Sequence, residues 1–421
     1  MKSLNPFDKF NVQSIPLHGD ISILSAAHEP EYFPHREEQI EKMVNSMRGL
    51  MMGMKTNHLL IYGKTGTGKT SVTKYVASKL NEKMDGNLVI SYINCQAYDS
   101  PYSIMVNIAK KIPGAENIPV SGWPLDRIYD ELVIAMSKSG IPVVVILDEI
   151  DKLVEKNGGD SLYMILKLLD ENAGIRGNVV GITNDTSFYE KLDSRIKSRL
   201  NRDSVIFHPY NTEQLKDILI PRISSILGPE QYEEAAINLC AAIGAQEHGD
   251  ARKAIDLMRI SIELAMLESA SVVEREYVYR ARDKLDSDIL RDTVITLPTH
   301  AKLVLFSVIM SRQIHPNSAT TGEVGLYYEK ICFIAGYTPL TSRRVSDYIS
   351  DLEDYGIIST MLKSLGRYGR TRLINITARE EDIKNFILED LDLEKLRSVN
   401  FSLQQKLAMS TLINLVQRSG I

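Results

Sequence analysis

Short apolar runs alternate with longer stretches of helical periodicity through the first half of the chain. The clearest run, residues 143–147, is continuously apolar, rich in β-branched residues and followed by two carboxylates, which is typical of a strand buried within a parallel sheet. Similar runs predict strands at residues 59–62, 88–94, 179–183 and 205–207. Helical stretches lie between them, at residues 71–80, 101–111 and 125–139. This alternation predicts an α/β fold with a parallel sheet.

Helical periodicity dominates the second half. Residues 211–285 are continuously helix-like and predict a small helical domain, and residues 286–298 resemble a linker. Three helices and two strands are then predicted, at residues 303–310, 323–335, 341–352, 357–365 and 371–376. Three helices followed by a hairpin indicate a winged-helix domain.

The segments at the two ends are less regular. The first thirty residues contain three prolines and predict an arm, after which a helix is expected from residue 32 to about residue 52. Residues 381–421 continue as an amphipathic helix. The domains expected are an arm (1–30), an α/β domain (31–210), a small helical domain called the lid (211–290), a winged helix (298–390) and a C-terminal helical extension (391–421).

Composition narrows the class of protein without naming a partner. The chain has 421 residues and a net charge of -5, so any basic surface for nucleic acid must be local. Its three cysteines are far apart and predict neither a zinc site nor a disulfide framework. No apolar run approaches 18 residues, and the N-terminus lacks the apolar region of a signal peptide. We therefore expect no membrane segment and a cytoplasmic protein.

A glycine-rich segment between a predicted strand and a predicted helix carries the strongest chemical signal. Residues 63–70 read Gly-Lys-Thr-Gly-Thr-Gly-Lys-Thr, the phosphate-binding loop pattern in its usual context. Backbone N–H groups of Gly63, Gly66, Thr67 and Gly68 would face phosphate oxygens at a helix N-terminus. The motif assigns Lys69 to the β- and γ-phosphates and the hydroxyl of Thr70 to Mg²⁺. An ordinary glycine-rich turn is the alternative.

Polar residues follow two of the predicted strands. Asp148 and Glu149 come directly after the buried run, where α/β sheets bind their ligands. Asp148 would hold Mg²⁺ and Glu149 would polarise the attacking water. The alternative is an acidic pair that caps a helix after a core strand. Asn184, after the next strand, would contact the water or the γ-phosphate, although asparagine is also common in turns.

Several arginines are candidates for contacts with a nucleotide. Arg195 and Arg199 lie between the last two predicted elements of the sheet, where an arginine could reach the site of a neighbouring subunit. Arg252 begins a helix of the predicted lid and could reach the γ-phosphate. Solvent-exposed helix faces and surface ion pairs are the ordinary alternatives.

The predicted winged helix carries a local basic surface. Arg343 and Arg344 start its third helix, the one expected to enter the major groove. The hairpin has no acidic residue around its tip, where the candidate contacts are Lys363, Arg367, Tyr368, Arg370 and Arg372. This concentration of positive charge favours DNA over the protein partners that winged helices also bind.

The order of these motifs resembles the archaeal Orc1/Cdc6 replication initiators within the AAA+ ATPases, over nearly the whole chain. The phosphate loop and the Asp148–Glu149 pair are shared by many ATPases. More specific matches are Pro-His-Arg-Glu at 34–37, Phe-His-Pro-Tyr at 207–210 and Gly-Asp-Ala-Arg at 249–252. Together with the C-terminal winged helix, they resemble this family in particular.

The resemblance implies roles for further residues. Asn184 and Arg252 look like the two sensors of this family, and Tyr210 and Arg222 match positions lining the nucleotide. Arg199 looks like the arginine finger and Arg195 is a second candidate, because many archaeal relatives have serine at the position of Arg199. A looser match puts Lys110 and Lys111 on a helix that touches DNA.

The function implied is a replication initiator with ATP or ADP and Mg²⁺ as cofactors. Such a protein binds double-stranded origin DNA, helps to load an MCM-type replicative helicase, assembles with other initiator subunits, and hydrolyses ATP slowly as a switch. A clamp loader-like ATPase and a DNA-binding regulator that holds nucleotide without using it are the alternatives.

Overall fold

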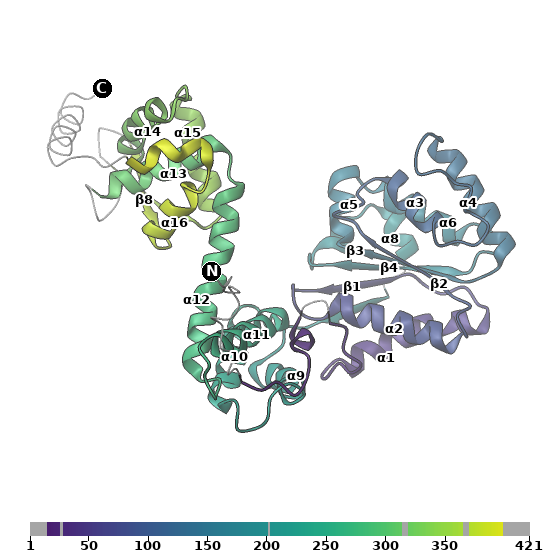
Figure 1. Cartoon of the computed structure of the whole chain (residues 1–421). Helices are drawn as coiled ribbons and strands as arrows, with labels where there is room; N and C mark the ends of the chain where they lie inside the picture. The colour runs from purple at the N-terminus through teal and green to yellow at the C-terminus, as the bar shows by residue number, and fades with distance from the viewer. Residues whose placement is uncertain (1–14, 26–27, 201–202, 314–318, 365–369, 399–421) are drawn as a thin grey trace, which may run out of the picture. The chain divides into compact units, whose positions relative to one another are not determined.

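The structure is a computed structural model, which describes residues 15–25, 28–200, 203–313, 319–364 and 370–398. The chain divides into two compact units, Met1–Ala281 and Arg282–Ile421 (Figure 1). Within the described residues, no helix combines the length and the apolar character needed to cross a membrane.

A five-stranded parallel sheet forms the centre of the first unit. Its strands are β1 (Leu59–Gly63), β2 (Val89–Asn94), β3 (Val143–Asp148), β4 (Gly177–Thr183) and β5 (Ser204–Phe207). Their order is β2-β3-β4-β1-β5, and every neighbouring pair is parallel. All residues of β3 and β4 are buried, as expected for central strands with both faces covered. The predicted α/β class and parallel sheet are confirmed.

Helices cover both faces of this sheet (Figure 1). One face packs against α3 (Pro101–Ala109), α4 (Leu125–Ser139), α5 (Ile150–Asn157), α6 (Asp160–Asp170) and α8 (Ser194–Leu200). The other face packs against α1 (Glu37–Met47) and α2 (Lys69–Lys83). The short elements are η2 (Ile21–Leu24), η3 (Arg48–Met52) and α7 (Phe188–Lys191). Because the strands are parallel, their carboxyl ends share one edge, which is where such sheets bind ligands.

The helix expected over residues 32–52 is shorter and divided. It begins at Glu37, because Pro34 precedes it and His35 adopts a left-handed backbone with φ 62°, and a helix cannot start through such a residue. At its other end the α-helix gives way to the 3₁₀ turn η3, which Gly53 ends at φ 71°.

A helical lid completes the first unit. Its helices are α9 (Thr212–Ser224), α10 (Glu234–Gln246) and α11 (Ala251–Leu267), and α12 (Arg275–Thr296) follows. Most of the segment expected to be a linker, residues 286–298, is regular helix, because α12 continues to Thr296. Leu290 and Val294, one helical turn apart, pack against the core of the second unit, and the exposed Arg282 and Asp286 pair at 3.8 Å.

The second unit has the winged-helix arrangement that the sequence predicts. Helices α13 (Thr299–Arg312), α14 (Thr321–Ala335) and α15 (Ser342–Asp354) pack on one core with the strands β6 (Ala319–Thr320), β7 (Ile358–Ser364) and β8 (Arg370–Ile376). The strands pair in the order β6-β8-β7, and β7 and β8 form the antiparallel hairpin. The amphipathic stretch from residue 381 is α16 (Glu380–Ile387) and η5 (Leu391–Ser398), and its remainder lies outside the described residues.

Candidate nucleotide-binding site

The glycine-rich loop joins β1 to α2 as the sequence predicts. Gly66 and Gly68 have φ of 72° and 89°, a region that other residues rarely adopt. A side chain at Gly66 would also place its Cβ 1.8 Å from Oδ1 of Asp250. The buried hydroxyl of Thr67 donates to the Lys64 carbonyl at 2.8 Å. The glycines therefore leave the backbone N–H groups of the loop uncovered at the start of a helix, which is the arrangement of an anion-binding site.

Lys69 is held between this loop and the end of β4. Its Nζ donates to the carbonyl oxygens of Gly63 at 2.9 Å and Lys64 at 2.7 Å, and to Oδ1 of Asn184 at 2.8 Å. The residue is only 6% exposed, and burial lowers the pKa of Lys69 to about 8, against the opposing effect of Asp148. The structure thus brings the predicted lysine and the predicted asparagine together at the carboxyl edge of the sheet.

Two hydroxyl groups donate hydrogen bonds to the same carboxylate oxygen of Asp148. Its Oδ2 accepts hydrogen bonds from Oγ1 of Thr70 and from Oη of Tyr92, both at 2.8 Å. Among the described residues there is no cluster of three His, Cys, Asp or Glu side chains that would hold a metal by itself. A magnesium ion bound with phosphate needs only one or two protein ligands, so the Thr70–Asp148 pair fits it.

Glu149 has an unusual backbone. It lies in the left-handed region at φ 55° and ψ 45°, immediately before α5, and its N–H donates to Oδ1 of Asp148 at 3.1 Å. A residue other than glycine is strained there by about 1–2 kcal/mol. Behind it, Oγ1 of Thr183 donates to the buried Asp151 at 2.7 Å. The turn that carries Glu149 is thus fixed from two sides.

The lid contacts the phosphate loop directly. The N–H of Ala251, the first residue of α11, donates to the carbonyl oxygen of Gly66 at 3.1 Å. Asp250 caps the same helix, accepting from the N–H of Arg252 at 2.8 Å. This contact puts the exposed Arg252 at the mouth of the site.

A cavity of about 330 Å³ extends from the loop into the lid. Gly66, Gly68, Tyr210, Arg222 and Arg252 line it, so the predicted nucleotide contacts come together. Residues of the N-terminal segment, among them Ile23 and His28, close one side. Nη1 of Arg222 donates to the Ile23 carbonyl at 3.3 Å, and burial lowers the pKa of this arginine.

Arg36 and Tyr92 contact the site but were not among the predicted site residues. Arg36 is 3% exposed and donates to the carbonyl oxygens of Thr67 at 3.1 Å and His208 at 2.8 Å. Its guanidinium lies 3.7 Å from the centre of the Tyr210 ring, and burial lowers its pKa. The Pro-His-Arg-Glu motif was the available signal for Arg36, whereas nothing local marks Tyr92.

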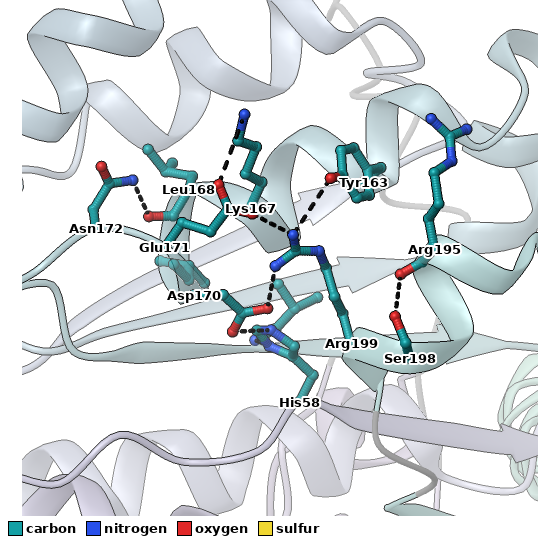
Figure 2. Close-up of polar contacts among 12 residues, drawn as sticks. His58, Tyr163, Lys167, Leu168, Asp170, Glu171, Asn172, Arg195, Ser198 and Arg199 are labelled. Carbon is teal, nitrogen blue, oxygen red and sulfur yellow. Dashed lines mark hydrogen bonds and ion pairs between the residues drawn. The ribbon is translucent and has the colours of Figure 1, made fainter.

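Arg199 is engaged within its own chain. Figure 2 shows its guanidinium directed at the end of α6, where it bonds Asp170 at 3.1 Å, the Tyr163 hydroxyl at 3.4 Å and the carboxylate of Glu171. Asp170 also accepts at 3.1 Å from His58, whose Nδ1 accepts from the N–H of Val179. Arg199 is thus part of a network that joins α8, α6 and the sheet.

Arg195, one helical turn earlier, is held less tightly. Its side chain is 56% exposed, against 19% for Arg199. It pairs with Asp160 and Asp193, both at 2.9 Å, and Asp160 is itself 80% exposed. In Figure 2 the guanidinium of Arg195 lies apart from Asp170 and Glu171, but both arginines contact the ring of Tyr163, at 5.1 Å from the ring centre for Arg195 and 4.9 Å for Arg199.

The predicted DNA contacts differ in their surroundings. Lys110 and Lys111 are exposed directly after α3, and Arg343, Arg344 and Lys363 are exposed in the second unit. Arg372 is partly buried and donates to Oγ of Ser350 at 2.9 Å, which ties β8 to α15. Arg367 and Tyr368 lie outside the described residues, as does the side chain of Arg370.

Comparison with protein families identifies the three parts of the chain. Residues 53–184 match the AAA domain model, residues 216–283 the Cdc6 AAA+ ATPase-type lid domain, and residues 292–386 the CDC6 C-terminal winged helix domain. An ORC1-type DNA replication protein of Thermoplasma volcanium is 47% identical over 96% of this chain and 99% of its own. The chain belongs to the Orc1/Cdc6 family of DNA replication initiators.

Other relatives support the same assignment of this Orc1/Cdc6 protein. The ORC1-type DNA replication protein 1 of Archaeoglobus fulgidus is 41% identical over 96% of this chain and 98% of its own. Among solved structures, the Aeropyrum pernix ORC1 protein in complex with DNA is 35% identical, with a TM-score of 0.77 over 90% of this chain and 98% of that one. The predicted family and the predicted fold are confirmed.

Proposed function

We propose that this Orc1/Cdc6 protein binds ATP with Mg²⁺ in the cavity between the phosphate loop and the lid, and hydrolyses it slowly as a switch. The observation that carries the proposal is the convergence of Lys69, Thr70, Asp148 and Asn184 at the carboxyl edge of the sheet. That edge also carries the strained Glu149.

Each residue has a distinct task in this proposal. Bare N–H groups of the loop and the N-terminus of α2 bind the phosphates, and Lys69 exchanges its carbonyl partners for phosphate oxygens. Thr70 and Asp148 hold the magnesium ion, which offsets phosphate charge when bound. Glu149 orients the attacking water, Asn184 holds that water or the γ-phosphate, and Arg252 contacts the γ-phosphate from the lid.

We assign the arginine that acts on a neighbouring subunit to Arg195 rather than Arg199. An arginine acting in trans must leave its partners in cis, and Arg199 would leave two carboxylates and a tyrosine hydroxyl in a partly buried network. Arg195 would leave two carboxylates, of which Asp160 is 80% exposed, and the Tyr163 ring, which Arg199 contacts as well. Exposed ion pairs contribute little. Its exposure supports the same choice.

The second unit is proposed to hold double-stranded origin DNA. The DNA complex of the Aeropyrum pernix relative supports this. Arg343 and Arg344 are exposed at the N-terminal end of α15, the position from which a recognition helix contacts bases. We propose Lys363, Arg367, Tyr368 and Arg370 as wing contacts, and Lys110 and Lys111 as contacts from the first unit. Arg372 would position α15.

The wider role follows as part of the same proposal. Bound to an origin in its ATP state, the protein would help to load an MCM-type replicative helicase, with other initiator subunits. Hydrolysis would end that state, so turnover would be slow.

The test combines DNA binding with ATP turnover. Purified protein with ATP should bind duplex DNA from its own chromosomal origin with an affinity that falls steeply with salt. Glu149→Gln should keep ATP bound without hydrolysing it. No salt-sensitive origin binding would refute the initiator role, and rapid DNA-stimulated turnover would indicate a clamp loader-like motor. Unchanged behaviour of Glu149→Gln would indicate a regulator that only holds nucleotide.

A further inference from the structure

Methionine is concentrated in one short segment of the first unit. Five of the fifteen methionines in the chain lie between residues 43 and 54, at positions 43, 47, 51, 52 and 54. Met43 and Met47 are buried in the core beneath the sheet, whereas Met51, Met52 and Met54 are 47%, 68% and 52% exposed. The segment therefore contributes to the core on one side and leaves an apolar surface on the other.

This surface borders a groove between α1 and α2. Its floor is apolar, formed by Met47, Val76 and Leu80, and its near wall consists of Val44 and Met51. The cavity measures about 470 Å³. We call it the methionine groove, and it is lined in full by Val44, Met47, Arg48, Met51, Val76, Lys79, Leu80, Glu82 and Lys83.

The methionine groove is separate from the nucleotide cavity, because the two share no lining residue. Helix α2 starts at the phosphate loop with Lys69, and the groove begins about two turns later at Val76. Catalysis as proposed above therefore does not account for these exposed side chains.

The rim of the groove is positively charged. Arg48, Lys79 and Lys83 stand against one carboxylate, that of Glu82, which Lys79 contacts at 2.8 Å. In the part of the chain that the structure describes, neither Arg48 nor Lys83 has an ion-pair partner. An occupant with acidic groups along its edge would satisfy both cations.

The shape and the lining indicate the kind of occupant. A groove between two helices with an apolar floor suits a third helix, which would place residues at i, i+3, i+4 and i+7 on that floor. Methionine adapts its shape to such helices better than branched residues do. Duplex DNA would use the rim cations but gain nothing from the floor and wall of apolar side chains.

We propose that the methionine groove docks an amphipathic helix of another protein, one that is apolar on one face and acidic along its flanks. Exposed apolar side chains are ordinary when scattered singly. Here Val44, Met51, Met52 and Met54 are each about half exposed or more, and they lie within eleven residues of one another. The unpaired cations beside them select the charge of the partner.

The test uses the full-length protein labelled with ¹³C at the methionine methyl groups. Three synthetic peptides of about 20 residues, long enough to form a helix, are titrated in turn. One has leucines on a single face and glutamates on the flanks, the second replaces the glutamates with lysines, and the third is a scramble of the first. The acidic peptide should shift the methyl signals of Met47, Met51 and Met52, and the other two should leave them unchanged.

Variants make the test specific. Met51→Glu and the double variant Arg48→Glu/Lys83→Glu should each weaken binding of the acidic peptide at least about tenfold. The charge-reversed double variant should in turn bind the lysine peptide. Ile134→Glu, at an apolar residue on α4 that is 60% exposed, is the control and should bind as the unaltered protein does. All four residues are exposed, and thermal unfolding checks that each variant folds.

Three results would overturn the proposal. The first is an absence of methyl shifts with the acidic peptide, or equal shifts with all three peptides. The second is displacement of the peptide by duplex DNA acting on the same signals, which would make the groove a nucleic-acid site. The third is movement of these signals with protein concentration alone, which would make it a contact between copies of this chain.

Discussion

The network around Arg199 provides the sharpest test of how the two candidate arginines divide their roles. Arg199→Ala removes one charged partner each from Asp170 and Glu171 and a donor from Tyr163. Hydrogen bonds to charged groups contribute about 1.5–3 kcal/mol when buried, and exposed ion pairs about 0.2–1 kcal/mol. With Asp170 and Glu171 34% and 45% exposed, we expect a loss of about 1–2 kcal/mol.

Thermal and urea unfolding measure this loss. For a unit of this size, 1 kcal/mol corresponds to a shift in Tm of about 2–4 °C, so Arg199→Ala should lower Tm by about 2–8 °C. Arg195→Ala removes a side chain that is 56% exposed, with a partner, Asp160, that is 80% exposed, and should change stability by less than about 0.5 kcal/mol. In assemblies on DNA, Arg195→Ala should nevertheless lose most of the ATP turnover.

A double-mutant cycle decides whether Arg199 acts through its carboxylates. Asp170→Asn/Glu171→Gln should destabilise the protein, and Arg199→Ala should add little to it, with a coupling of about 1 kcal/mol. Releasing Arg199 in this way should also not raise turnover. Additive effects on stability, or loss of turnover from Arg199→Ala but not from Arg195→Ala when both are folded, would refute the assignment.

Three further predictions concern the site itself. Tyr92→Phe removes one of the two hydroxyls on Asp148 and should raise the magnesium concentration needed for half-maximal ATP turnover about tenfold; an unchanged magnesium titration would contradict a role for Tyr92 in positioning Asp148. Gly66→Ala should weaken nucleotide binding at least about tenfold for two reasons. The new Cβ would clash with Asp250, and alanine is strained at the φ of 72° that Gly66 adopts. The double variant Gly66→Ala/Asp250→Ala should recover only part of that affinity by calorimetry, and full recovery would show that the backbone strain is unimportant. Burial lowers the pKa of Lys69 to about 8 in the folded protein, from 10.5 in the unfolded chain. Between about pH 8 and pH 10.5 the unfolded chain therefore binds more protons than the folded protein, so the contribution of Lys69 to stability rises with pH in that range. Relative to Lys69→Met, the nucleotide-free protein should gain stability between pH 7.5 and pH 10 in urea unfolding, and no gain would mean that Lys69 titrates normally.

Local motifs account for the parts of the site that the sequence predicts well. Gly66, Lys69 and Thr70 belong to one strand–loop–helix segment, and Asp148 ends a strand whose buried run is unmistakable. Their mutual positions follow once the strands that carry them, β1 and β3, lie parallel on either side of β4 in one sheet. Whether each acts as proposed stays a prediction.

Other features depend on which strands are neighbours, and periodicity does not reveal that. Tyr92 reaches Asp148 only because β2 lies beside β3. Arg36 reaches Thr67 and His208 because β1 and β5 pair behind it. Residues 286–296 looked like a linker because they contain few apolar residues, yet Leu290 and Val294 stand one helical turn apart and pack against the core of the second unit.

The strained backbone at Glu149 has a consequence for engineering this family. Glycine or asparagine at that position would relax the left-handed turn, and the folded protein would gain about 1 kcal/mol. A library screened only for survival on heating is therefore expected to enrich those two residues there. The most heat-resistant variants would lack the side chain assigned to the attacking water. Selection for heat resistance alone would therefore favour proteins that bind ATP but do not hydrolyse it.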